Sequence, residues 1–300
     1  MGRHEGNHEY GRIYGSLADP EYSPRPRRDP VLTSVRTFAE LLITTGIVVL
    51  LFVVYEVYIT DWISAGKQRE ATAALDDQWR QSDTVDGGQR SAHYDLKDGQ
   101  GFAKLYIPAF GPDYQFTVLE GATDKILESG PGHYKGTALP GEPGNFSVAG
   151  HRVGKGAPFN DLDLLSSCDA IVVETHTDWF IYRVLPMKSE LPDWQQDKGT
   201  DPRCADVRLL KDEEQDNGGP YGDTYGLEIV SPKQGSVIAP VPHRPEDEIP
   251  QAEQASLMTL TTCHPRFSDR QRLIIHGVLV KKWKKDPTRL DQLPPELQET

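Results

Sequence analysis

The chain has 300 residues, with 32 Lys and Arg against 45 Asp and Glu, and a formal net charge of -13. This acidic balance argues against nucleic-acid binding, because contact with phosphates needs a basic surface. The 23 prolines and 27 glycines favour short strands joined by turns over long helices. Three cysteines are too few for a disulfide-dense scaffold.

The N-terminal region contains one segment that is apolar enough to cross a membrane. Residues 1–36 are polar and turn-rich, and we expect a disordered cytoplasmic tail. The apolar run that follows predicts a transmembrane helix over residues 37–60, since about 20 apolar residues span a bilayer core. A buried core helix is the alternative, and a cleaved signal peptide would have a shorter and earlier apolar run.

The charges that flank this run predict its orientation. Arg25, Arg27, Arg28 and Arg36 precede it, and Asp61 follows it. The positive-inside rule therefore predicts a cytoplasmic N-terminus and an extracellular remainder.

After the membrane span we expect a polar stalk over residues 61–101, with a short exposed helix within it. The region 102–283 has the pattern of a mainly β domain, because turn-forming residues separate its short strand-like runs. This pattern favours a closed or sandwich-like β fold with few helices. We expect residues 284–300 to form a C-terminal tail. The predicted strands are 102–108, 116–119, 145–150, 170–176, 179–184, 227–232, 236–242, 257–263 and 272–280, and the clearest short helix lies within 121–130.

An acidic, glycine-rich stretch over residues 191–224 interrupts the β pattern. Its carboxylates lack the spacing of an EF-hand, so we predict a solvated loop in preference to a calcium site. The cysteines and histidines lack zinc-finger spacing, and the chain has no P-loop. We therefore expect no metal and no cofactor.

Three residues have the types that thiol-dependent acyl transfer requires, namely a nucleophile, a proton shuttle and an oxyanion donor. Cys263 ends a strand-like run and precedes a turn, so its thiol is accessible. His151 follows another strand, after Gly150. Arg272 opens the strand after Cys263, and antiparallel pairing would bring the two together. A buried structural cysteine, a structural histidine and solvated arginines, including Arg266 and Arg270, are the alternatives.

The motifs around these residues resemble the sortase family of cysteine transpeptidases. "TLTTC" followed by an Arg is similar to the sortase signature, and "NFSVAGH" resembles the segment around the sortase histidine. "GPGHYKGTALPGEPG", "GAPFNDLDLL" and "PVP" resemble class E sortases of Gram-positive actinobacteria. The similarity covers about residues 102–283. The long acidic stretch at 191–224 departs from the family pattern.

This resemblance implies an eight-stranded sortase-type β-barrel and assigns roles to particular residues. Cys263 would be the nucleophile, His151 the general acid and base, and Arg272 the residue that orients the substrate and stabilises the oxyanion. The thiol would cleave an LAxTG-like or LPxTG-like sorting signal of a surface protein between Thr and Gly. A peptidoglycan precursor amine of the lipid II type would then receive the acyl group. The expected signal-binding residues are Tyr134, Ala149, Thr261 and Thr262.

Two other functions remain open at this point. A membrane-anchored cysteine peptidase would hydrolyse the same intermediate, although papain-like enzymes place the cysteine before the histidine. A non-catalytic binding module with a β head is the second alternative. A disulfide between Cys168 and Cys204 is compatible with an oxidising compartment, but the sequence leaves both cysteines free to be unpaired.

Overall fold

A computed structural model describes residues 30–55, 60–85, 96–211, 215, 218–245, 249–286 and 292–299. The chain divides into an N-terminal unit that ends at Leu51 and a second unit that starts at Phe52. Residues 1–29 lie outside the described residues; they include most of the predicted tail 1–36 and three of the four arginines that precede the predicted span.

Helix α1 (Pro30–Val54) contains most of the predicted membrane span. Its 25 residues correspond to a length of about 37 Å, enough to cross a hydrocarbon core of about 30 Å. Its large apolar side chains are exposed, as a helix surrounded by lipid requires. The helix begins before the predicted residue 37, at a proline, which is favoured in the first turn because its missing N–H is not needed there.

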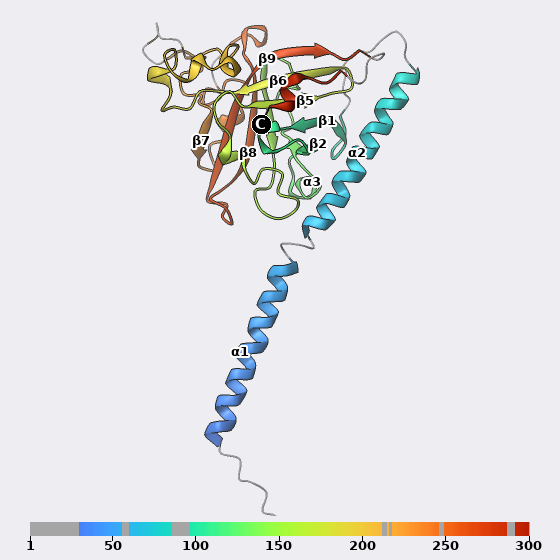
Figure 1. Cartoon of the computed structure of the whole chain (residues 1–300), viewed down its shortest axis with the longest axis vertical. Coiled ribbons are helices and arrows are strands. Elements are labelled where there is room, and N and C mark those ends of the chain that lie inside the picture. The colour runs from blue at the N-terminus through green and yellow to red at the C-terminus, as the bar shows by residue number, and fades with distance from the viewer. Residues whose placement is uncertain are drawn as a thin grey trace, which may run out of the picture. The chain divides into compact units, whose positions relative to one another are not determined.

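The second unit is built on a closed β-barrel (Figure 1). Eight strands form the ring in the order β6-β5-β1-β2-β3-β4-β8-β9, and the pairing of β9 with β6 closes it. The predicted eight-stranded barrel is therefore confirmed. The short strand β7 (Leu227–Val230) pairs with the first part of β9 as a ninth member of the sheet. The barrel strands are β1 Gly101–Tyr106, β2 Gln115–Glu120, β3 Gly132–His133, β4 Gly144–Ala149, β5 Ala170–Glu174, β6 Asp178–Val184, β8 Ser256–His264 and β9 Gln271–Lys284.

Alternating side chains along the strands separate the barrel core from the outer face of the sheet. On β8, Met258 and Leu260 belong to the main apolar cluster, together with Leu273 and Ile275 of β9. Successive strand residues point to opposite faces, so Cys263 lies on the face opposite to these core residues. The catalytic cysteine candidate is thus kept out of the packed interior.

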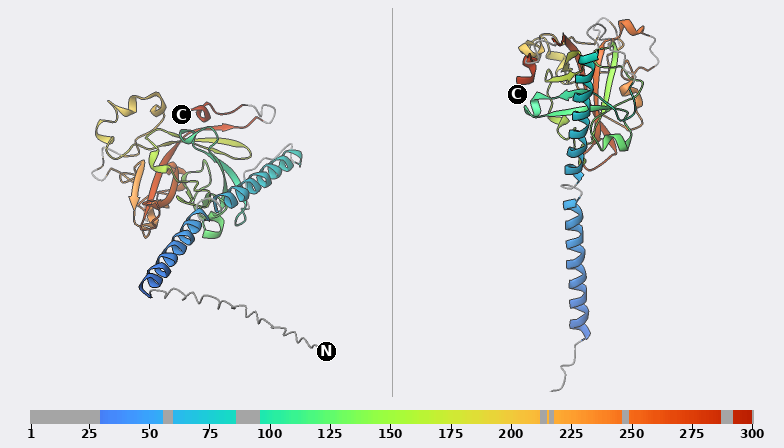
Figure 2. Two further views of the ribbon diagram at one scale, coloured as in Figure 1. Left: turned by 60° about the horizontal axis from the view of Figure 1, so that its bottom comes forward. Right: turned by 90° about the vertical axis from the view of Figure 1, so that its right-hand side faces the viewer.

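Helix α2 (Thr60–Val85) differs from the predicted stalk, because it packs against the barrel (Figure 2). The Gln68 side chain accepts from the Thr117 backbone N–H at 2.9 Å and donates to the Ser129 carbonyl at 2.5 Å. Leu75 is only 1% exposed, and the Thr72 and Thr117 hydroxyls are 2.7 Å apart. The helix is therefore part of the head. The polar sequence concealed this because the contact is made largely by side-chain hydrogen bonds.

The predicted strand over residues 236–242 is wrong, since this segment begins as the 3₁₀ turn η7 (Gly235–Ile238) and continues as irregular chain. Pro240 and Pro242 lack the N–H groups that a strand ladder needs. The amide of Asn145 instead donates to the Ala239 carbonyl at 3.1 Å, so a side chain satisfies part of this backbone.

The acidic stretch 191–224 is more ordered than the solvated loop that we expected. It contains three 3₁₀ turns, and Trp194, Val207 and Tyr221 are buried in an apolar cluster with residues of β8 and β9. A disulfide joins Cys204 of this stretch to Cys168. The turns are η4 Leu191–Asp193, η5 Lys198–Thr200 and η6 Pro202–Cys204; residues 212–214, 216 and 217 lie outside the described part of the chain.

The remaining helical elements are short. Helix α3 (Asp124–Leu127) lies where the sequence predicted one. The C-terminal segment returns to the head, where Glu299 forms an ion pair with Arg183, and Glu296 lies 3.3 Å from Lys281. The other 3₁₀ turns are η2 Pro108–Phe110, η3 Leu162–Leu164, η8 Gln251–Glu253 and η9 Pro295–Gln298.

Candidate active site

Cys263 lies near the end of β8, where the strand leaves the barrel. It is partly exposed and is the one free cysteine, because Cys168 and Cys204 are paired. Strand β8 pairs with β4 up to Ala149–Thr261 and with β9 from Leu257 to His264. The backbone at Cys263 is therefore fixed by β9, just beyond the end of the pairing with β4.

His151 is positioned by the end of β4. The Gly150 N–H donates to the Thr261 carbonyl at 3.0 Å, and the Thr262 hydroxyl donates to the Gly150 carbonyl at 2.8 Å. A side chain at position 150 would lie 2.5 Å from the ring of Phe159, so only glycine allows this approach. These contacts hold His151 beside the strand that carries Cys263.

The environment of His151 favours its neutral form. Burial lowers the pKa of the imidazole below its usual value, and the positive charge of Lys155 lowers it further. Asp124 and Glu128 act in the opposite direction but do not reverse the shift. The Nε2 atom is buried and has no hydrogen-bond partner in the described structure. A neutral ring with an unoccupied nitrogen is suited to accept or donate a proton when a substrate is bound.

Cys263 and His151 line the same cavity, which has a volume of about 300 Å³. Most of the residues that line this cavity follow His151 or Cys263 in the chain. One of them, Phe267, has 85% of its surface exposed. The full set of lining residues is His151, Arg152, Val153, Cys263, Phe267, Ser268 and Asp269. The structure thus brings together the two residues that the sequence proposed as nucleophile and base.

Arg272 is the cross-strand partner of Cys263 in the β8–β9 ladder. Directly opposed residues in an antiparallel pair share a face, with Cβ atoms about 4.5–5.5 Å apart. The guanidinium does not line the cavity, however, because it donates to the carbonyls of Asp269 and Gln271 at 2.9 and 3.0 Å. The backbone position of Arg272 fits the predicted role. To contact a substrate, its guanidinium would have to break its hydrogen bonds to these two carbonyls.

A second arginine at this site was missed by the sequence reasoning. Arg152 is 4% exposed, forms an ion pair with Asp163 at 2.9 Å, and lies 2.8 Å from Nδ1 of His264. It also lies 3.4 Å from the Cys263 carbonyl. Its position directly after His151 was the available signal. Its buried contacts tie the β4 end to the turn after Cys263.

Comparisons with known proteins agree with this geometry. Residues 105–280 match the sortase domain family. The chain belongs to the sortase family. Members of this family are cysteine transpeptidases that act on sorting signals, and the relatives described next support a class E sortase.

Two curated sortases of Streptomyces coelicolor are similar to this sortase. SrtE1 is 31% identical over 265 residues, which are 86% of this chain and 60% of SrtE1. SrtE2 is 30% identical over 287 residues, which are 91% of this chain and 92% of SrtE2. This chain therefore spans less than two thirds of the length of SrtE1. The solved SrtF sortase from Corynebacterium diphtheriae is 41% identical, with a TM-score of 0.60 over 72% of this chain and 100% of that one.

The predicted signal-binding residues of the sortase lie beside one another on β4, β8 and the segment after β3. The Tyr134 hydroxyl is 2.9 Å from the Thr261 hydroxyl, Thr261 pairs with Ala149 in the sheet, and the Tyr134 N–H donates to the Ser147 carbonyl of β4 at 2.9 Å. Tyr134 is half-buried, whereas Ala149, Thr261 and Thr262 are buried. Thr262 differs from the other three because its hydroxyl is occupied by Gly150, so it supports the base instead of facing a ligand.

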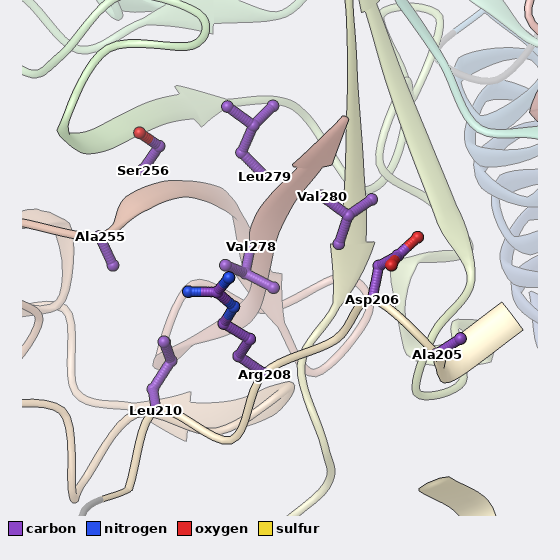
Figure 3. Close-up of a pocket in the computed structure, with 9 residues that line it drawn as sticks. All are labelled: Ala205, Asp206, Arg208, Leu210, Ala255, Ser256, Val278, Leu279 and Val280. Atoms are coloured by element: carbon purple, nitrogen blue, oxygen red, sulfur yellow. The ribbon is translucent and has the colours of Figure 1, made fainter. Parts of the chain in front are cut away.

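A larger cavity of about 610 Å³ lies away from Cys263, between the 191–224 stretch and strands β8 and β9 (Figure 3). Val278, Leu279 and Val280 form one wall, and Asp206 and Arg208 supply its charged side chains. Its lining residues include neither a cysteine nor a histidine. The smaller cavity is therefore the candidate active site of the sortase.

Proposed function

We propose that this sortase cleaves an LAxTG-like sorting signal between Thr and Gly and transfers the protein to a cell-wall amine. The observation that carries the proposal is the cavity that Cys263 and His151 share, with Arg272 paired to Cys263 in the adjacent strand. The match to the sortase domain family supports the type of reaction. The sorting signal and the acceptor amine are our own proposal.

The first half of the reaction forms a thioester. His151 accepts the thiol proton of Cys263, and the sulfur attacks the carbonyl carbon of the signal's threonine. The imidazolium then gives this proton to the departing glycine amine as the C–N bond to glycine breaks. Arg272 donates to the carbonyl oxygen as negative charge develops on it, once its guanidinium has left the carbonyls of its own loop.

The second half transfers the acyl group to an amine. The amine nitrogen attacks the thioester carbon, His151 takes its proton, and the Cys263 thiolate leaves as the new amide forms. No nucleotide is required, because the thioester retains the free energy of the peptide bond that was broken. We propose a lipid II-like peptidoglycan precursor as the physiological amine.

The test of the reaction uses the full chain in detergent with an LAxTG peptide and a diglycine amine. Mass spectrometry should detect the ligated product and an acyl-enzyme on Cys263. The Cys263→Ala variant should yield neither, whereas a binding module would keep its function in this variant. Formation of free acid alone, with no ligated product at high amine concentration, would identify a peptidase and overturn the proposal.

We further propose that α1 anchors the head on the outer side of the membrane. The arginines before the span and Asp61 after it support this orientation. Protease added to intact protoplasts should remove the head and spare the N-terminal segment. Survival of the head under conditions that cleave the N-terminal segment would contradict the orientation.

A further inference from the structure

Outside the active site, three metal-ligand side chains meet near the pairing of β7 with β9. Glu228 lies on β7, His276 on β9, and His243 on the chain that follows β7. Within the part of the chain that the structure describes, their ligand atoms all lie within 4.8 Å of one another. His276 is fully buried, and Glu228 and His243 are partly buried.

A chain of hydrogen bonds fixes which nitrogen of His276 carries the proton. The Asn145 amide N–H group donates to the Ala239 carbonyl, which leaves the Asn145 oxygen as an acceptor. The Thr259 hydroxyl donates its only proton to that oxygen at 2.7 Å. Thr259 Oγ1 can then only accept from Nδ1–H of His276, which lies 2.8 Å away. In neutral His276 the lone pair is therefore on Nε2.

Among the residues that the structure describes, that lone pair has no hydrogen-bond partner, and it faces a carboxylate. His276 Nε2 is buried without a hydrogen bond, and Glu228 Oε1 lies 3.5 Å away. Nε2 of His243 lies 2.8 Å from Glu228 Oε2, within ion-pair distance. A lone pair and a carboxylate repel each other in a buried site unless a cation lies between them.

We propose that Glu228, His243 and His276 bind a divalent transition metal of the Zn²⁺ class. Two imidazole nitrogens and a carboxylate form a known zinc ligand set, with a fourth position for water. Tetrahedral Zn²⁺ with bonds of about 2.0–2.1 Å places its ligands roughly 3.3 Å apart. The two Glu228 distances, 2.8 and 3.5 Å, bracket this value.

The surroundings also match those of a metal ligand. A metal-bound histidine usually donates its other ring N–H to a fixed oxygen, and Thr259 supplies one to His276. Since His243 lies outside any helix or strand, it is the ligand that is free to adjust. The bound ion would join β7, β9 and the segment that leads into β8.

The binding test uses the full chain in detergent on the Cys263→Ala background, which removes the free thiol. After chelator treatment and dialysis, calorimetric titration with ZnCl₂ should show one site per chain and a rise in melting temperature. Titration with Co²⁺ should give a visible ligand-field spectrum without a thiolate charge-transfer band. Glu228→Gln, which keeps the size of the side chain, and His243→Ala should each weaken Zn²⁺ affinity on the order of 100-fold or more, since loss of an outer partner alone costs about 10–100-fold.

Matched variants separate metal binding from general damage. His176→Ala removes a partly buried histidine outside the cluster and should leave Zn²⁺ affinity unchanged. Thr259→Val should weaken binding by about 10-fold, whereas Thr259→Ser keeps the hydroxyl and should restore it. Absence of a stoichiometric site in the parent protein, or equal affinity in folded Glu228→Gln and the parent, would overturn the proposal. A proton, not a metal ion, would then lie between His276 Nε2 and the Glu228 carboxylate.

Discussion

Replacement of Arg272 by Lys separates a catalytic role from a structural one. Lys keeps the positive charge but loses the planar fork that lets Arg form two parallel hydrogen bonds. If Arg272 stabilises the oxyanion, turnover should fall by about 10²–10³, which corresponds to roughly 2.7–4 kcal/mol of transition-state stabilisation. Peptide transfer, measured by mass spectrometry or chromatography under saturating LAxTG peptide, reports this loss.

The same substitution should cost little stability. In the structure the Arg272 side chain is partly exposed, and among the described residues its guanidinium donates to the carbonyls of Asp269 and Gln271. A hydrogen bond contributes about 0.5–1.5 kcal/mol, and Lys can keep one of the two, so we expect a loss of about 1 kcal/mol or less. For a domain of this size that is a change in melting temperature of about 2–4 °C.

Two other arginines provide the controls. Arg266→Lys changes an exposed side chain that pairs with Asp161, and neither turnover nor melting temperature should change much. Arg152→Lys disrupts buried contacts and should lower the melting temperature clearly more than Arg272→Lys does. If Arg272→Lys retains normal turnover while a folded Arg152→Lys is inactive, then Arg152 is the cation of the site and our choice is wrong.

Three further predictions concern residues around the site. In the parent protein we expect a preference of about 10–200-fold for LAxTG over LPxTG peptides. Tyr134→Ala should shift this ratio of catalytic efficiencies toward one; an unchanged ratio would mean that Tyr134 contributes only to packing. The double variant with Cys168→Ser and Cys204→Ser should lose about 2–5 kcal/mol of unfolding free energy in denaturant titrations but keep most of its transfer activity, and an inactive folded protein would contradict this. Lys155→Ala should raise the pKa of His151 in an NMR titration, because a positive charge that disfavours the imidazolium is removed; a lowered or unchanged pKa would refute that cause.

The pKa shift of His151 also predicts how stability depends on pH. The imidazole has a lower pKa in the folded protein than in the unfolded chain, where it is about 6.5, so protons bind preferentially to the unfolded state. The contribution of His151 to stability is therefore complete above that unfolded value and is lost as the pH falls through the folded pKa. His151→Asn should make the melting temperature less sensitive to acid over this range. Equal sensitivity in both proteins would contradict the assignment.

Features that depend on local pattern can be predicted from the order of residues alone. An uninterrupted apolar run predicts a membrane-crossing helix from its length alone, and α1 has the length and the exposed apolar surface required. Alternating residues and turn formers predicted most barrel strands, including β8 with Cys263 at its end. The spacing around Cys263 and Arg272 predicted their antiparallel pairing, which the β8–β9 ladder confirms.

Tertiary structure decided the features that depend on contacts between distant segments. Docking of α2 rests on Gln68 bonding to Thr117, far along the chain, and no periodicity in a polar helix reveals it. Cys168 and Cys204 are separated by 36 positions, and only the folded acidic stretch brings them together. The cavity beside Cys263 and the cluster around Glu228 arise in the same way. Their side chains come from separate elements, and the sheet register that aligns those elements is set by packing of the whole barrel.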